Sequence, residues 1–135
     1  MNRYREIEEK HKAERRELTD RVDQERLHSH PGDYMLAYGI GYIRMEDREK
    51  AFSMNARHRS ELKDLIEEDT DGKGFIYDMF IAAMHDTEYA LTDDVKQVLD
   101  MLDMTEEDIQ GNPALQRGFL KAQEHYRRKQ GDNYD

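Results

Sequence analysis

The sequence predicts a mainly α protein: a single-domain helical assembly of about five helices, with one candidate short strand or hairpin near residues 34–45. Large apolar side chains recur at helical spacing between Gly74 and Leu102 more densely than elsewhere in the chain. A length of 135 residues is also typical of one domain with one core. We therefore expect one domain over residues 1–135, with a charged N-terminal helix at 3–27 and a helical core at 42–130.

The first predicted helix, residues 3–27, is highly charged and has only a narrow apolar stripe. Glu14 and Glu25 fall where a coiled coil would need apolar residues, which disfavours a continuous self-pairing zipper. We expect this helix either to lie on the body of the protein or to project from it. Homo-oligomer formation through residues 3–27 stays open as an alternative. The stripe consists of Tyr4, Ile7, His11, Leu18 and Val22.

A helix break and then an alternating segment follow. Pro31 disfavours the helical conformation of the preceding His30, so the first helix should end there. From residue 34 to 45 the side chains alternate with period two, which indicates a strand, and two glycines argue against a regular helix. A single strand or hairpin in so helical a chain would need another element to cover it.

The break itself carries a metal-like motif. His28-Ser-His30-Pro31 resembles the zinc-binding H-x-H-P piece of the metal-dependent deubiquitinase family, whose pattern continues with a serine and an aspartate. Tyr38 and Gly41 stand at those two positions, so we expect a solvated loop here and no zinc.

A helix from Asp47 to about Glu68 should come next, ending at an acid-rich loop, residues 69–74. Its predicted inner stripe consists of Phe52, Ala56, Leu62, Leu65 and Ile66. The loop fits the front half of a calcium-binding EF-hand, but Lys73 and Phe80 occupy its fifth and twelfth ligand positions. We therefore expect a turn in which Gly72 or Gly74 supplies a positive φ.

The remaining helices form the predicted core. The first has Ile76, Met79, Phe80 and Ala83 on its buried side, and the second, capped by Thr92 or Asp93, has Val95, Val98, Leu99 and Leu102. A capping box from Thr105 to Asp108 starts a short helical turn. Asn112 and Pro113 start a last helix, which has Leu115, Phe119, Ala122 and Tyr126 on one face.

The net charge of −10 is concentrated in one part of the chain. Residues 61–110 contain 3 Lys and Arg against 16 Asp and Glu, whereas the rest is nearly balanced. Such a block repels nucleic acid as a direct ligand and attracts a basic partner, although a solvated face is the simpler interpretation. The candidate partner-binding residues are Asp93, Asp94, Asp100, Asp103, Glu106 and Glu107.

Composition restricts the remaining functions. The chain has no cysteine, which excludes disulfides and thiolate metal sites, and it has neither an apolar run of membrane-spanning length nor a signal-peptide pattern. We expect a cytoplasmic protein that acts by binding, without enzymatic activity or cofactor. The enzymatic alternative is a small metal-dependent hydrolase that uses His85, Glu88 and Asp78.

Four segments in this order resemble a family of small phage and prophage proteins of unknown function. They are Gly74 to Phe80, His85 with Glu88-Tyr89, Thr92 and Asp94, Leu99 to Ile109, and Asn112 to Leu115, while an inserted Asp86-Thr87 and the segment 31–41 depart from the pattern. The resemblance implies a phage or mobile-element origin, hence the host cytoplasm, and brings no catalytic residue.

Charge and resemblance together predict an inhibitor of counter-defence, anti-CRISPR or antirestriction type. Its acidic face would block a host protein with a basic, nucleic-acid-handling groove. A self-assembling phage structural or accessory protein is the alternative without enzymatic activity.

Overall fold

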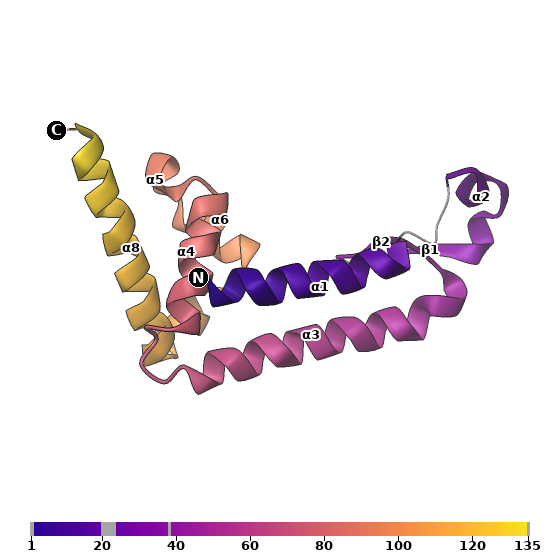
Figure 1. The fold of residues 1–135 in the computed structure, drawn as a ribbon, viewed down its shortest axis with the longest axis horizontal. Helices are drawn as coiled ribbons and strands as arrows, with labels where there is room; N and C mark the ends of the chain where they lie inside the picture. The colour runs from indigo at the N-terminus through magenta and orange to yellow at the C-terminus, as the bar shows by residue number, and fades with distance from the viewer. Residues whose placement is uncertain (1, 20–23, 38, 135) are drawn as a thin grey trace. The chain divides into compact units, whose positions relative to one another are not determined.

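Helices make up most of the computed structural model, which describes residues 2–19, 24–37 and 39–134, with side chains up to Arg127 (Figure 1). This confirms the mainly α prediction. In chain order the elements are α1 (Arg3–Thr19), α2 (Gln24–Ser29), β1 (Tyr34–Ala37), β2 (Gly41–Arg44), α3 (Arg48–Glu68), α4 (Phe75–Asp86), α5 (Tyr89–Thr92), α6 (Val95–Met101), α7 (Glu106–Gln110) and α8 (Pro113–Tyr134), with 3-10 turns at Pro31–Asp33 and Met45–Asp47.

Two compact units make up the chain. Unit 1 comprises Met1–Glu6 and Leu65–Asp135, and unit 2 comprises Ile7–Asp64. Each unit is described by itself below.

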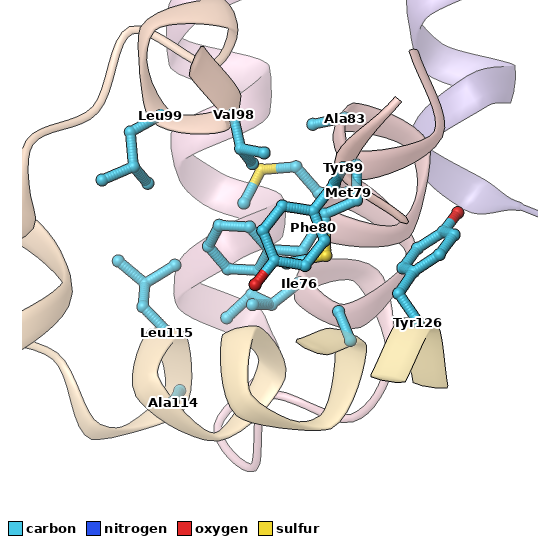
Figure 2. Close-up of a cluster of buried hydrophobic side chains, with 12 residues drawn as sticks. Ile76, Met79, Phe80, Ala83, Tyr89, Val98, Leu99, Ala114, Leu115 and Tyr126 are labelled. Carbon is cyan, nitrogen blue, oxygen red and sulfur yellow. The ribbon is translucent and has the colours of Figure 1, made fainter. Parts of the chain in front are cut away.

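Unit 1 is organised around α4, as the apolar periodicity predicts. Ile76, Phe80 and Met84 are completely buried in one cluster with side chains of α6 and α8 (Figure 2). The ring of Phe80 meets that of Phe119 edge to face, with centroids 5.3 Å apart. Burying an aromatic side chain of this size is among the largest single contributions to a small core.

Local hydrogen bonds start the later helices of unit 1 where the sequence indicates. Oδ1 of Asn112 accepts from the backbone N–H groups of Ala114 and Leu115, and Thr105 and Asp108 form a complete capping box. One predicted cap was wrong: α6 is capped by Asp94, whose carboxylate accepts from the N–H of Gln97. Neither Thr92 nor Asp93 caps it, because Thr92 still belongs to α5 and Asp93 has a left-handed backbone with φ 54°.

Unit 2 contains the hairpin expected near residues 34–45. Strands β1 and β2 pair antiparallel, with Met35 opposite Ile43 and Leu36 opposite Tyr42. Ile43 is fully buried, whereas Leu36 and Tyr42 are exposed, so the hairpin has one inner and one outer face. Tyr38 lies outside the described residues.

The small core of unit 2 corrects the stripe predicted for α3. This core consists of Leu18, Ala37, Ile43, Ala51 and Met54. Phe52, with 55% of its surface exposed, and Ala56 are not part of it, because α3 turns Ala51, Met54 and His58 inward instead. The buried residues of α3 thus keep helical spacing, but one of them is a histidine. A search for apolar residues alone does not find this face.

The N-terminal helix is confirmed as far as Thr19, and α2 covers Gln24–Ser29. Val22, part of the predicted stripe, lies outside the described residues. His11 and Leu18 of that stripe are buried. Among the described residues, no helix combines the length and apolar character needed to cross a bilayer.

Candidate functional site

The acidic surface, defined as Asp93, Asp94, Asp100, Asp103, Glu106 and Glu107, extends from the end of α5 through α6 to the first turn of α7. All six residues are exposed. On the other side of α6, Val98 and Leu99 are buried in the core of unit 1. The amphipathic pattern of α6 therefore directs Asp100, the member of the acidic surface that lies within this helix, to solvent.

Backbone geometry contributes to this exposure. Asp93 and Asp103 follow α5 and α6 with φ values of 54° and 55°, the left-handed conformation in which aspartate is one of the better-tolerated residues. Asp94 is occupied as the cap of α6. Within the described part of the chain, none of the six carboxylates forms an ion pair, so their charge is not neutralised internally.

Two exposed apolar side chains occur in the same stretch of unit 1. Leu91 of α5 is 83% exposed and Met101 of α6 is 50% exposed. Protein interfaces combine such apolar contacts with a charged rim, and methionine is enriched in them. The stretch 91–107 thus carries both kinds of side chain that a protein partner would use.

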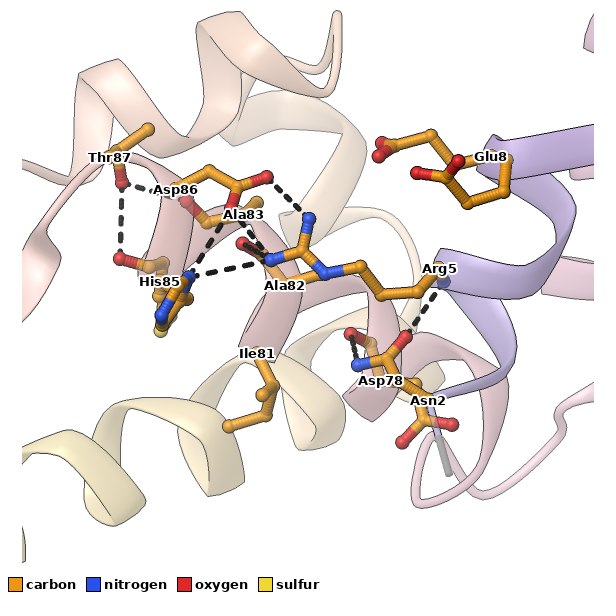
Figure 3. A network of polar contacts seen from close by, with 12 residues as sticks. Asn2, Arg5, Glu8, Asp78, Ile81, Ala82, Ala83, His85, Asp86 and Thr87 are labelled. Atoms are coloured by element: carbon orange, nitrogen blue, oxygen red, sulfur yellow. Dashed lines mark hydrogen bonds and ion pairs between the residues drawn. The ribbon is translucent and has the colours of Figure 1, made fainter. Parts of the chain in front are cut away.

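The three side chains of the enzymatic alternative, those of Asp78, His85 and Glu88, make separate contacts. The carboxylate of Asp78 accepts from the backbone N–H of Arg3 at 2.9 Å. Nδ1 of His85 lies 3.3 Å from Oδ1 of Asp86 (Figure 3). Glu88 is exposed at the start of α5, with φ 56°. No described hydrogen bond joins any two of Asp78, His85 and Glu88.

Residues 2–5, at the start of α1, form hydrogen bonds to this part of α4. Both terminal nitrogens of the Arg5 guanidinium donate to Asp86, at 2.7 and 2.6 Å, and Nδ2 of Asn2 donates to the carbonyl of Asp78 (Figure 3). The hydrogen bond from Arg5 lowers the pKa of Asp86. This network holds residues 2–5 on α4 within unit 1.

The EF-hand-like loop, residues 69–74, forms the N-terminal cap of α4. Oδ2 of Asp69 accepts from the N–H groups of Gly74 and Ile76, at 3.1 and 2.9 Å, and Asp71 accepts from that of Lys73. Gly72 has φ +78°, which confirms the predicted turn. Among the described residues, no three His, Asp or Glu side chains lie so that they could hold a metal ion.

The histidines of the H-x-H-P motif, His28 and His30, are both exposed. They lie at and just beyond the end of α2, as expected for a solvated loop.

Unit 2 contains a polar cluster that the sequence analysis missed, here called the His–Glu cluster: His11, Glu14, Arg57, His58 and Glu61. Nε2 of His11 lies 2.8 Å from Oε2 of Glu61, and Nε2 of His58 lies 3.2 Å from Oε2 of Glu14. The two rings stack, with centroids 3.7 Å apart and planes 14° apart. Arg57 bridges both carboxylates.

A repeated motif was the available signal for this cluster. His11 and Glu14 form H-x-x-E on α1, and His58 and Glu61 form the same motif on α3. Residues three apart share a helix face, so two antiparallel helices with this motif can exchange His–Glu pairs. In the sequence analysis His11 appears only as a stripe residue and Glu14 only as an argument against a coiled coil.

Burial and pairing shift the ionisation of the cluster. Its histidine rings are buried, with His11 3% and His58 4% exposed. Burial lowers the pKa of His58, and the hydrogen bond that His58 donates to Glu14 opposes that shift. The hydrogen bonds from Arg57 and then His58 lower the pKa of Glu14 to about 2, and that from His11 lowers the pKa of Glu61.

A groove of about 370 Å³ in unit 2 reaches the cluster at Glu14 and Arg57. Leu18 and Met54 supply apolar lining, and Lys50 adds a further cation. Solvent therefore has access to the carboxylate side of the cluster, while the histidine rings stay buried.

Comparison with known proteins gives a family and no activity. No curated protein and no solved structure matches the chain. The model of a family of unknown function, DUF7659, matches residues 17–125, a region that includes the acidic surface. Since this match covers well over half of the chain, the protein belongs to the family of unknown function DUF7659.

Proposed function

We propose that this protein acts by binding, and that its acidic surface enters the basic groove of a nucleic-acid-handling protein. The observation that carries the proposal is that six neighbouring acidic residues are exposed and that none of them has a described ion pair. Concentrated charge of one sign raises association rates with a partner of the opposite sign. A phage or mobile-element origin and an inhibitory role in counter-defence are part of the same proposal.

The exposed apolar side chains support a protein partner over a free polycation. Leu91 and Met101 supply contact area that simple charge neutralisation does not require. We expect charge to set the association rate and these two side chains to slow dissociation.

Charge reversal tests the proposal. Replacing Asp100, Asp103 and Glu107 by lysine changes three exposed residues outside the core and should leave the helical circular dichroism signal unchanged. The matched control reverses three exposed glutamates outside the acidic surface, namely Glu9, Glu17 and Glu25. Both triple variants carry the same change in net charge.

The assay measures release of DNA from purified RNA-guided nucleases and restriction enzymes, with a basic protein that lacks a nucleic-acid groove as the negative partner. We expect the parent and the control variant to displace DNA, and the acidic-surface variant to be at least tenfold weaker. Binding should weaken steeply with salt, since exposed charges are screened over about 10 Å at 0.1 M. Equal loss in both variants, or no displacement by the parent, would contradict the proposal.

A further inference from the structure

The His–Glu cluster joins α1 to α3 in unit 2 through two reciprocal pairs. The order of these pairs, His11 with Glu61 and Glu14 with His58, shows that the two helices run antiparallel there. Among the described residues, the apolar core of unit 2 has five buried members. The cluster is therefore a substantial part of what holds these two helices together.

The surroundings of His58 suit a neutral ring. Nε2 of His58 is directed at the carboxylate of Glu14 and acts as the donor, whereas Nδ1 is buried and has no hydrogen-bond partner among the described residues. A bare lone pair at Nδ1 is tolerated, but a second proton would create a buried N–H with no acceptor.

The stack adds a second penalty for protonation. Neutral imidazole rings pack well at a centroid distance of 3.7 Å, whereas two imidazolium rings at that distance repel each other. The charged groups that face the pair are Glu14 on α1 and Arg57 and Glu61 on α3. Because Arg57 already compensates both carboxylates, they are less available to compensate two further positive charges.

We propose that the His11–His58 pair is a pH-sensitive latch, which holds α1 against α3 in unit 2 while both rings are neutral and opens in mildly acidic solution. Opening would uncover Leu18 and Met54, which belong to the small core and line the groove beside Glu14. The same groove gives solvent protons access to the cluster.

The pKa of His58 agrees in direction with this latch. Burial lowers it, so the open state binds a proton more readily than the closed state. The closed state is therefore stable above the ordinary histidine range, near pH 6.5, and loses stability as the pH falls through that range.

Distance measurements between the two helices test the latch directly. The chain has no cysteine, so Ala13→Cys on α1 and Ser60→Cys on α3, both at exposed positions of unit 2, can carry spin labels on the full chain. We expect one narrow distance distribution at pH 7.5 and a clearly broader one at pH 5.5. An unchanged distribution between these two pH values would overturn the proposal.

Two further substitutions assign the effect to the stacked pair. His58→Phe keeps an aromatic ring in the stack and removes its titration, so broadening at pH 5.5 should be lost. His30→Gln removes an exposed histidine of the same unit and should leave the broadening in place. Equal broadening in the parent and in His58→Phe would contradict the latch.

Nitrogen NMR of the imidazoles in the parent protein provides a test that does not depend on the folding of any variant. At pH 7.5 we expect His58 to be protonated at Nε2 and bare at Nδ1, and to titrate at a lower pH than the imidazoles of the urea-unfolded chain. A His58 titration coincident with that of the unfolded chain, or a proton on Nδ1 at pH 7.5, would overturn the proposal.

Discussion

Gly118 of α8 lies so close to Ile76 of α4 that a Cβ atom on the glycine would be 2.5 Å from Cγ2 of that isoleucine. The same Cβ would be 2.6 Å from the carbonyl oxygen of Gly72. Both distances are shorter than any normal contact, so the absence of a side chain at residue 118 sets how closely α8 approaches α4 within unit 1.

The first prediction follows from this contact. Gly118→Ala should lower the free energy of unfolding by roughly 1–3 kcal/mol, because α8 must shift to relieve the overlap. Gly111→Ala is the matched control: residue 111 has a helical backbone, and a Cβ there would come no closer than 3.4 Å to any other atom. Urea titrations followed by circular dichroism compare the two, and a Gly118→Ala variant as stable as the control would contradict the prediction.

The second prediction concerns the centre of the unit 1 core. Phe80 is completely buried and packs edge to face on Phe119, so Phe80→Ala should cost about 3–5 kcal/mol. Leu120→Ala on α8 removes an apolar side chain that is 61% exposed and should change stability by less than about 0.5 kcal/mol. Calorimetric melting distinguishes the two; equal losses would place Phe80 outside the core.

The third prediction concerns calcium. Asp69 is occupied by two backbone N–H groups of the α4 start, and Lys73 and Phe80 stand where an EF-hand has oxygen ligands. Millimolar calcium should therefore leave the melting temperature unchanged, whereas Asp69→Ala should cost about 0.5–2 kcal/mol as a lost helix cap. Micromolar calcium affinity in a calorimetric titration would contradict this interpretation of the loop.

The fourth prediction is the acid dependence of unit 2. The pKa of Glu14 is about 2 in the folded protein against an ordinary value of 4.5, so the unfolded chain binds this proton first. The stabilisation from Glu14 is present above pH 4.5 and is lost as the pH falls from 4.5 toward 2. Opening of the latch separates Glu14 from Arg57, so this test uses the His58→Phe background, in which the latch stays closed. In that background, urea midpoints measured between pH 5.5 and 2.5 should fall less steeply with Glu14→Gln than without it.

The control for this acid dependence is Glu25→Gln, which changes an exposed glutamate on α2. It should keep the steep dependence of the parent. If both substitutions leave the pH dependence of the His58→Phe protein unchanged, the pairing of Glu14 with Arg57 contributes nothing to stability.

The sequence by itself determined the elements whose cause is local. The spacing of Ile76, Met79, Phe80 and Ala83 fixed the buried face of α4, and Asn112 fixed the start of α8 through hydrogen bonds to the next turn. Period two at residues 34–45 predicted the hairpin. These signals succeed because each involves residues only a few positions apart.

Only the tertiary structure decided which polar side chains meet. His11 and Glu61 are 50 residues apart, and nothing in either helix alone shows that their faces oppose each other. The same limit explains why α3 buries His58 and exposes Phe52: the packing partner selects the buried face, and the hydrogen bond that His58 donates to Glu14 offsets the cost of burying a polar ring. The carboxylates of the acidic surface could be counted in the sequence, but whether a described cation pairs with them depends on which cations the fold brings near them.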